Sequence, residues 1–264
     1  MQHSQLGFGV TGSLPLETVR AIARRAGEIG LASLWFNETA DGDALACAEV
    51  AFGESTSIVV GTGVIAVNRR PAPRIIREVM ARNLPQDRLI VGIGSSAKPS
   101  PLSTVAENLA VLRSELSAKT VVGSLGPKMR KLGAERSNGL LFNWLPPEYA
   151  AETTATLREQ AAAVGNSPVL AATYIRTALG DDALPRLRDE AARYSAAPSY
   201  AANFERLGIT AMQSAVHAPD AEGVRAGLQA FDGTVDYVIV RAITPTDDVD
   251  HYLRLLDAIA PLAT

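Results

Sequence analysis

The sequence has few of the side chains that most often carry out catalysis or bind metals. It contains one cysteine, three histidines and 5% aromatic residues in 264 positions. A single cysteine excludes a disulfide framework, and the apolar neighbours of Cys47 favour a buried, unreactive thiol. None of His3, His217 and His251 has a cysteine or carboxylate at metal-ligand spacing, and no Gly-x-Ser-x-Gly motif occurs. We therefore expect neither a metal site nor a serine nucleophile.

Charge of one sign is also lacking. The formal net charge is −3, and basic residues are scattered or confined to short clusters such as 128–131. This pattern argues against binding to nucleic acids or anionic membranes. The polar start of the chain, residues 1–5, runs directly into an apolar strand, and no apolar stretch is long enough to cross a bilayer. We expect a cytoplasmic protein that acts on a small molecule.

What the sequence does contain is a repeated unit, a short apolar run followed by a segment in which apolar residues have helical spacing. Continuous apolar runs indicate strands buried on both faces, and their alternation with helices indicates parallel pairing. Eight such units predict a single (β/α)8 TIM barrel domain over residues 1–264. The stretch 196–222 is less regular, and we expect extra helix and loop there. The predicted strands are Leu6–Thr11, Leu34–Asn37, Ile58–Ile65, Leu89–Gly94, Thr120–Ser124, Gly139–Phe142, Pro168–Thr173 and Tyr237–Arg241.

Polar residues after the second predicted strand are candidates for the active site, because such barrels place their sites at the carboxyl ends of the strands. Asn37 and Glu38 follow two aromatic residues and suit a polar ligand. Asp43 is expected to cap the next helix. The alternative is that the acidic residues in this segment, Asp41 or Asp43, serve only as helix caps.

A candidate anion site follows the fifth predicted strand, in the segment 124–129. Ser124 and Gly126 end the strand, and Pro127 suits the first position of a helix. The free amides of that helix start would face a bound anion, with Lys128 adding a positive charge. We expect phosphate to bind here. The alternative is an ordinary strand-to-helix turn with a solvated lysine.

Two stretches, 61–66 and 92–97, formally match the Gly-x-Gly-x-x-Ala form of the dinucleotide-binding fingerprint. That fingerprint requires a helix to open directly after its glycines. The first match continues into Val-Asn-Arg-Arg-Pro and the second into Lys-Pro-Ser-Pro, neither of which starts a helix. We therefore expect these glycines to mark bulges or the close approach of backbone to a ligand.

A series of segments makes the sequence resemble the luciferase-like flavin-dependent oxidoreductases, in particular the branch that uses the deazaflavin coenzyme F-420. The resemblance covers most of the chain. The segments that carry it are Ser33–Thr39, Val60–Ile65 with Arg69–Pro71, Arg88–Ser95, Leu125–Met129, Ser137–Leu145 and Asp236–Arg241.

The resemblance implies an enzyme whose cofactor ring lies over the strand ends and exchanges a hydride with an organic substrate. It implies a non-proline cis peptide bond at or next to Gly63-Val64. It also implies that Asn37 and Glu38 face the ring or the substrate, and that the turn at 126–128 holds the cofactor phosphate. The residues expected to bind the cofactor are Thr62, Gly63, Val64, Ser95, Ser124, Gly126, Pro127 and Lys128.

Two alternatives remain open at this point, an FMN-dependent monooxygenase and a non-catalytic protein that binds a flavin or a partner. The family usually has a long excursion between its fourth and fifth strands, whereas only 95–119 intervenes here, which implies a more open site. The resemblance also implies a homodimer. Helices at 43–52 and 75–84 would provide the contact unless their apolar residues all face the strands. Those apolar residues are Ala44, Cys47, Val50, Ile76, Val79 and Met80.

Overall fold

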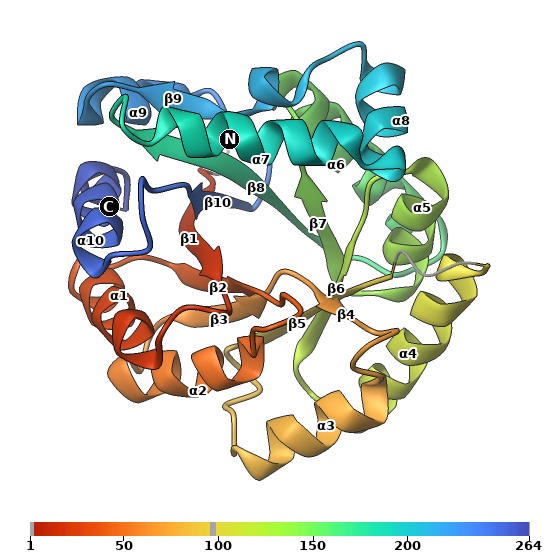
Figure 1. The fold of residues 1–264 in the computed structure, drawn as a ribbon. Coiled ribbons are helices and arrows are strands. Elements are labelled where there is room, and N and C mark those ends of the chain that lie inside the picture. The colour runs from red at the N-terminus through yellow and green to blue at the C-terminus, as the bar shows by residue number, and fades with distance from the viewer. Residues whose placement is uncertain (1–2, 96–98, 264) are drawn as a thin grey trace.

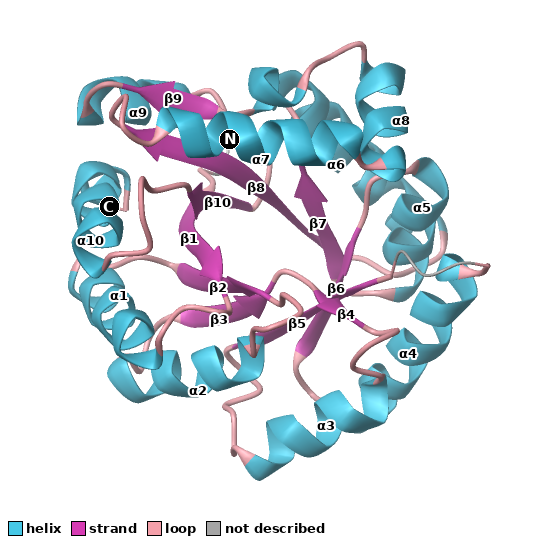
Figure 2. Cartoon of the chain, viewed as in Figure 1, coloured by secondary structure: helices cyan, strands magenta, loops and turns pink. Residues whose placement is uncertain are grey.

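A closed ring of parallel strands forms the centre of the computed structural model, which describes residues 3–95 and 99–263 (Figure 1). Helices surround this ring on the outside (Figure 2). The sheet order is β10-β1-β2-β3-β5-β6-β7-β8, and β8 pairs with β10 to close it. The strands are β1 (Gln5–Thr11), β2 (Ser33–Asn37), β3 (Val59–Thr62), β4 (Ile65–Ala66), β5 (Leu89–Gly94), β6 (Lys119–Gly123), β7 (Gly139–Asn143), β8 (Leu170–Leu179), β9 (Val216–Ala218) and β10 (Tyr237–Ala242).

Eight strand positions make up the barrel within the described residues. β3 and β4 share one position, because β3 pairs with the start of β5 and β4 with its end. β9 lies off the ring and pairs with the last three residues of β8. The predicted (β/α)8 barrel is therefore confirmed.

Local residues set the ends of several helices, and the predicted cap at Asp43 is confirmed. The Asp43 carboxylate caps α2 by accepting hydrogen bonds from the amides of Leu45 and Ala46, at 3.0 and 3.1 Å. Gly30, with φ +72°, follows the end of α1 in the left-handed conformation that glycine adopts easily. No helix in the described ranges is long and apolar enough to cross a membrane. The α-helices are α1 (Leu16–Glu28), α2 (Ala44–Glu54), α3 (Ala72–Ala81), α4 (Pro101–Glu115), α5 (Pro127–Arg136), α6 (Pro147–Ala163), α7 (Leu184–Ala196), α8 (Pro198–Leu207), α9 (Ala221–Gln229) and α10 (Val249–Ile259).

Apolar side chains fill the inside of the barrel. Trp35 and Tyr174 are buried there and meet edge to face, with ring centroids 6.4 Å apart. A Cβ atom at Gly61 would lie 2.3 Å from the Trp35 ring, so glycine at this position makes room for the indole. The interior is a packed core rather than a channel, which leaves the carboxyl ends of the strands as the place for a ligand.

Three predicted segments differ from the structure. β8 begins at Leu170 and continues to Leu179, well beyond the predicted end at Thr173, because the polar residues that follow find partners inside the fold. For example, Thr177 Oγ1 donates to the carbonyl of Ile175 at 3.0 Å. The predicted strand 58–65 is interrupted between β3 and β4. The irregular stretch 196–222 contains α8, a 3-10 turn and the unpredicted strand β9.

The apolar residues expected at a dimer contact mostly pack inward. Met80 on α3 differs from the others, with 52% of its surface exposed. The buried ones are Ala44, Cys47 and Val79, and the half-buried ones are Val50 and Ile76. Most of this set is therefore explained by packing against the strands, and the homodimer stays a prediction.

Candidate functional site

Inward-facing residues at the carboxyl ends of the strands form the mouth of the barrel. Successive residues of a strand point to opposite faces of the sheet, and Trp35, Tyr174 and Ile239 pack together inside the barrel. Residues two positions later on the same strands therefore face the same interior, one layer nearer the mouth. They are Asn37 on β2, Arg176 on β8 and Arg241 on β10. The layer at the mouth is polar, whereas the layer below it is mainly apolar.

The bulge between β3 and β4 fills one side of the mouth. The peptide bond Gly63-Val64 is cis, as the sequence resemblance predicts. Cβ atoms added to Gly94 or Gly123 would lie 2.9 and 2.8 Å from methyl carbons of Val64, closer than normal packing allows. Both glycines are therefore needed to make room for Val64, which is itself only half-buried. Its side chain gives the mouth an apolar side.

Arg176 is held in place by residues from β7, α7 and the loop after β7. Its side chain is 1% exposed. Nε donates to Glu190 Oε1 at 3.0 Å, and Nη1 donates to Asn143 Oδ1. The centre of the guanidinium lies 4.2 Å from the Trp144 ring centroid and 4.9 Å from that of Tyr194, within the range of cation–π attraction. Arg176 is thus fixed in orientation, and Glu190 balances its charge.

Arg241 lies beside Arg176 but has fewer contacts. The two residues are register partners on β10 and β8. Arg241 Nη1 donates to the carbonyl of Ala242 at 2.5 Å, and Nε is buried without a hydrogen-bond partner among the described residues. No carboxylate in the described part of the chain lies within 4.0 Å of its nitrogens. Arg241 therefore brings a positive charge that no neighbouring acid balances directly.

The two guanidinium groups affect the ionisable groups around them. Burial alone would raise the pKa of Glu190, but the positive charges of Arg241 and Arg176 outweigh it and lower that pKa below its ordinary value. Glu190 is therefore ionised at neutral pH. Burial raises the pKa of Tyr174, so its hydroxyl stays protonated. That hydroxyl has no hydrogen-bond partner within residues 3–95 and 99–263. The mouth thus combines two positive charges, one negative charge and a neutral donor.

Aromatic residues from α7, α8 and the loop after β7 cover Arg176. The ring centroids of Trp144 and Tyr194 are 5.2 Å apart, and those of Tyr194 and Tyr200 are 4.6 Å apart. Asn143 Nδ2 donates to the Tyr200 hydroxyl at 2.9 Å, and burial raises the pKa of Tyr200 to about 12. This cluster forms a neutral, ordered wall on the β7–β8 side of the mouth.

The start of α5 forms a second polar site at the same end of the barrel. Ser124 is 4% exposed, and its hydroxyl has no hydrogen-bond partner in the described part of the chain. Gly126 precedes the helix, Pro127 is its first residue and Lys128 is exposed. The first amides of the helix have no partners within it. On the next turn, burial lowers the pKa of Arg130 to about 10. These features lie where the sequence predicts an anion.

Comparison with known proteins gives a clear result for the structure but not for the sequence. No protein-family profile matches the chain, and no curated protein matches it in sequence. An F-420-dependent secondary alcohol dehydrogenase, solved with an F-420–acetone adduct, is 16% identical and has a TM-score of 0.80 over 100% of both chains. The F-420-dependent tetrahydromethanopterin reductase of Methanopyrus kandleri is 13% identical, with a TM-score of 0.78 over 98% of both chains.

A third similar structure binds a different cofactor. The oxygenating constituent of 3,6-diketocamphane monooxygenase from Pseudomonas putida, in complex with FMN, is 13% identical. Its TM-score is 0.70 over 98% of this chain and 97% of that one. The three structures share the closed (β/α)8 barrel of this chain.

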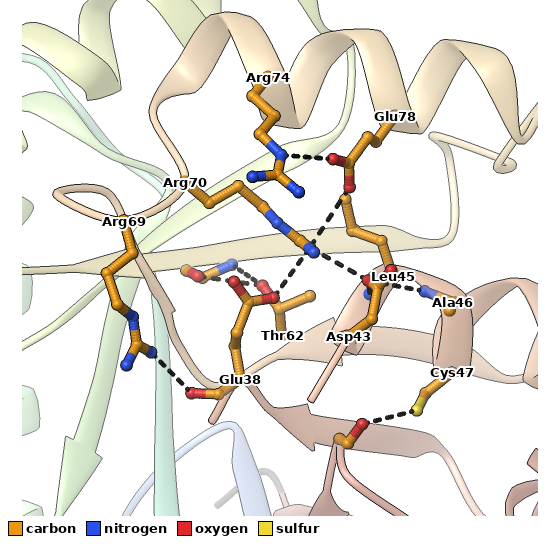
Figure 3. A network of polar contacts seen from close by, with 12 residues as sticks. Glu38, Asp43, Leu45, Ala46, Cys47, Thr62, Arg69, Arg70, Arg74 and Glu78 are labelled. Atoms are coloured by element: carbon orange, nitrogen blue, oxygen red, sulfur yellow. Dashed lines mark hydrogen bonds and ion pairs between the residues drawn. The ribbon is translucent and has the colours of Figure 1, made fainter. Parts of the chain in front are cut away.

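Glu38 forms an ion pair in this barrel, and its role toward a ligand stays a prediction. The Glu38 carboxylate lies 2.9 Å from Arg70 Nη1, and both side chains are less than 10% exposed. Figure 3 shows that Arg70 also reaches Asp43 and Glu78, at 3.1 and 3.5 Å. Glu38 follows Asn37 and therefore points to the opposite side of the chain, out of the mouth. This network ties the loop after β2 to the start of α3.

Other predicted residues also have structural partners in this barrel. Thr62 Oγ1 donates to the Gly92 carbonyl at 3.0 Å and accepts from the Gly92 amide at 2.9 Å, so its hydroxyl joins β3 to β5. Ser95 Oγ donates to Asn68 Oδ1 at 3.4 Å. Burial raises the pKa of Cys47 to about 12, which agrees with an unreactive thiol. The roles of these residues toward a cofactor stay predictions.

The helix that the dinucleotide fingerprint requires does not open directly after the first fingerprint-like stretch. The first, 61–66, continues into the short strand β4. The last residue of the second, Ala97, lies outside the described residues. No group of three or more metal-ligating side chains is found in the described ranges.

Sequence reasoning did not identify Arg176, Glu190 or Tyr174 as parts of the mouth. The seventh predicted strand ends at Thr173, so Tyr174 and Arg176 fall outside it. The alternation of Ala172, Tyr174 and Arg176 is the signal that would have placed the arginine inside the barrel. Glu190 lies on α7, and its approach to Arg176 depends on tertiary packing that no local pattern reveals.

Proposed function

We propose that this chain is an oxidoreductase that binds coenzyme F-420 and exchanges a hydride between it and a small organic substrate. The observation that carries the proposal is the combination, at one end of the barrel, of an anion site at α5 with a mouth that has an apolar and a polar side. Two of the similar structures are F-420-dependent enzymes.

The residues at α5 fit a phosphate-bearing cofactor. Ser124 Oγ is buried without a partner among the described residues, which is costly unless a ligand satisfies it. The first amides of α5 and the Lys128 ammonium provide further donors beside it. Helix starts of this kind bind phosphate through free amides and the helix dipole. We assign the cofactor phosphate to this position.

The bulge at Val64 fits the ring of the cofactor. Its half-buried side chain stands over Gly94 and Gly123 and offers the ring an apolar contact. A bound deazaflavin supplies or accepts the hydride, chemistry that amino-acid side chains do not provide. The chain itself contributes binding and orientation.

Polar groups on the other side of the mouth would orient the substrate. Asn37 Oδ1 and the Tyr174 hydroxyl are both buried without partners among residues 3–95 and 99–263. Arg176, immobilised by Glu190 and Asn143, gives this side a fixed ion pair. The aromatic wall beside Arg176 excludes water from the same region.

An FMN-dependent monooxygenase is the second candidate. The likeness to a monooxygenase solved with FMN favours it, and a phosphate site at α5 would suit FMN as well as F-420. The two proposals differ in the cofactor and share the site.

Titration of the purified protein with each cofactor tests the proposal. F-420 and FMN are added separately, and binding is followed by the change in their fluorescence. We expect saturable binding of F-420 that is tighter than that of FMN. Tighter binding of FMN would replace the first candidate with the second. Binding of neither would contradict both and favour a non-catalytic member of this fold.

A further inference from the structure

The charge balance at the mouth indicates what kind of substrate it binds. Arg176 is neutralised by Glu190, whose carboxylate lies 3.0 Å from it. Arg241 points into the same layer, but no carboxylate of the described residues lies within ion-pair distance of it. A positive charge that is partly removed from water without a counterion is unfavourable. Arg241 is therefore poised to receive an anion.

Two carboxylates act on Arg241 from a distance, and both are engaged elsewhere. Asp247 pairs with Arg186 at 2.7 Å and accepts a hydrogen bond from a tyrosine hydroxyl at 2.7 Å. Glu190 accepts from Arg176 Nε at 3.0 Å. Both carboxylates lower the cost of the Arg241 charge from beyond 4.0 Å, but neither forms an ion pair with it. Among the described residues, Arg241 therefore lacks a carboxylate in direct contact.

The hydrogen bonds of Arg241 leave one edge of its guanidinium unused. Nη1 donates to the carbonyl of Ala242. Nε is buried with no partner in the described ranges. Nε and Nη2 together form the side edge of the guanidinium, and two parallel donors at this spacing match the two oxygens of a carboxylate. Arg241 is half-buried rather than enclosed, so a ligand at the mouth can reach it.

A neutral donor lies within electrostatic range of Arg241. The Tyr174 hydroxyl has no partner in the described residues, and Arg241 is among the charges that oppose the burial-driven rise of its pKa. Because the hydroxyl is protonated, it can donate to an anion without adding negative charge. A neutral carbonyl compound bound at the same place would leave the positive charge of Arg241 without a counterion.

We propose that Arg241 binds a carboxylate of the substrate, so that this barrel acts on an organic acid. The redox step rests on the function proposed above, whereas the binding of the acid does not. Arg176 then serves as a positioning residue, since it holds one oxygen of Glu190 in a hydrogen bond and is itself fixed by Asn143.

Binding of benzoate and of its neutral analogue benzamide tests this proposal without knowledge of the natural substrate. Both are titrated into the protein with and without F-420, and dissociation constants are measured by ligand-observed NMR. We expect benzoate to bind more tightly than benzamide. Arg241→Gln should weaken benzoate binding by about 10- to 100-fold and leave benzamide binding unchanged. Arg241→Lys keeps the positive charge but loses the pair of parallel donors. Its affinity for benzoate should lie between those of the wild type and Arg241→Gln.

Arg193→Gln is the matched control, because Arg193 is a 75% exposed arginine 3.9 Å from Glu190. It should leave benzoate binding unchanged.

Equal binding of benzoate and benzamide, or unchanged benzoate binding in Arg241→Gln, would overturn the proposal. Selective binding of inorganic phosphate in place of benzoate would overturn the choice of carboxylate. Loss of F-420 binding in Arg241→Gln would instead assign the residue to the cofactor. Failure of F-420 to bind wild-type protein, with benzoate still bound, would contradict the proposed function alone.

Discussion

At the scale of single residues, two groups of charged side chains at this end of the barrel differ in their counterions. Glu38, Asp43 and Arg70 balance one another beside α3. Arg241 and the start of α5 carry positive charge without an acidic partner among the described residues. Substitutions in the first group should therefore change stability, whereas substitutions in the second should change binding.

Lys128→Ala should weaken cofactor binding by about 1–2 kcal/mol, the scale of one charge-assisted hydrogen bond. The fold should be unaffected, because the Lys128 side chain is exposed. The dissociation constant from fluorescence titration is the measurement. Lys131→Ala is the control, since Lys131 is 65% exposed on the same helix and faces Glu135. An unchanged constant in Lys128→Ala would remove this residue from the site.

Asp43→Asn should destabilise the protein by about 1 kcal/mol at neutral pH, because asparagine still caps the helix but loses two ionic contacts. Those contacts reach Arg70 and Arg82, each at 3.1 Å. Burial opposes ionisation of Asp43, yet its pKa is lowered by the Ala46 amide and these arginines. Its stabilising effect is therefore present above the ordinary aspartate pKa and lost as pH falls through the lowered value. Urea unfolding at several pH values should show the difference from wild type disappear in acid.

Glu38→Gln should have the opposite pH dependence. Burial raises the pKa of Glu38, an effect that Arg70 only partly opposes. Ionising it therefore reduces stability as pH rises from the ordinary glutamate pKa through the raised value. The variant should gain stability relative to wild type across that interval, while Arg70 keeps Asp43 and Glu78 as partners. If the gain in unfolding free energy over wild type instead shrinks as pH rises, this assignment is contradicted.

At the scale of elements, the bulge between β3 and β4 depends on the absence of side chains on β5 and β6. Gly123→Ala should destabilise the protein by about 1–3 kcal/mol, because its Cβ would lie 2.8 Å from Val64. Val64→Ala should remove most of the clash, so the double variant should be more stable than the sum of the single effects predicts. Chemical unfolding of all four proteins measures this coupling. Additive effects would show that Val64 is not the obstacle.

Much of the element pattern could be predicted from sequence because the strands are continuous apolar runs. The boundaries of β1, β2, β5 and β7 lie within a residue or two of their predicted positions. Asp43 was identified as a cap from its position just before an apolar helix. The cis bond at Gly63-Val64 followed from family resemblance rather than from the residues themselves.

The mouth was harder to predict because its residues meet through tertiary contacts. Glu38 directly follows Asn37, and a polar pair at a strand end gives no indication of which side chain points inward. The structure separates them, since Glu38 reaches Arg70 on the outer side. Arg176 was hidden because a buried arginine is unusual in a strand. It is accommodated by Glu190 and Asn143, which come from distant segments.

At the scale of the whole molecule, we predict a homodimer. An exposed Met80, together with half-buried Val50 and Ile76 on α2 and α3, would provide the apolar centre of the contact. A stable interface needs about 1,600 Å² of buried surface in total. Light scattering at micromolar concentration should give the mass of two chains. The Met80→Glu variant should give the mass of one chain. A monomeric mass for wild type would contradict the prediction.

The closure of the ring through β10 also has a consequence for synthesis of the chain. β10 pairs with β1 on one side and β8 on the other, yet it is the last of the barrel strands to leave the ribosome. Until Tyr237–Ala242 has emerged, β1 and β8 both present unpaired edges, which are prone to wrong pairing and aggregation. The ring can therefore close only after translation has passed Ala242. A ribosome-stalled chain that ends before Tyr237 should accordingly be far more sensitive to protease than one that extends well beyond Ala242.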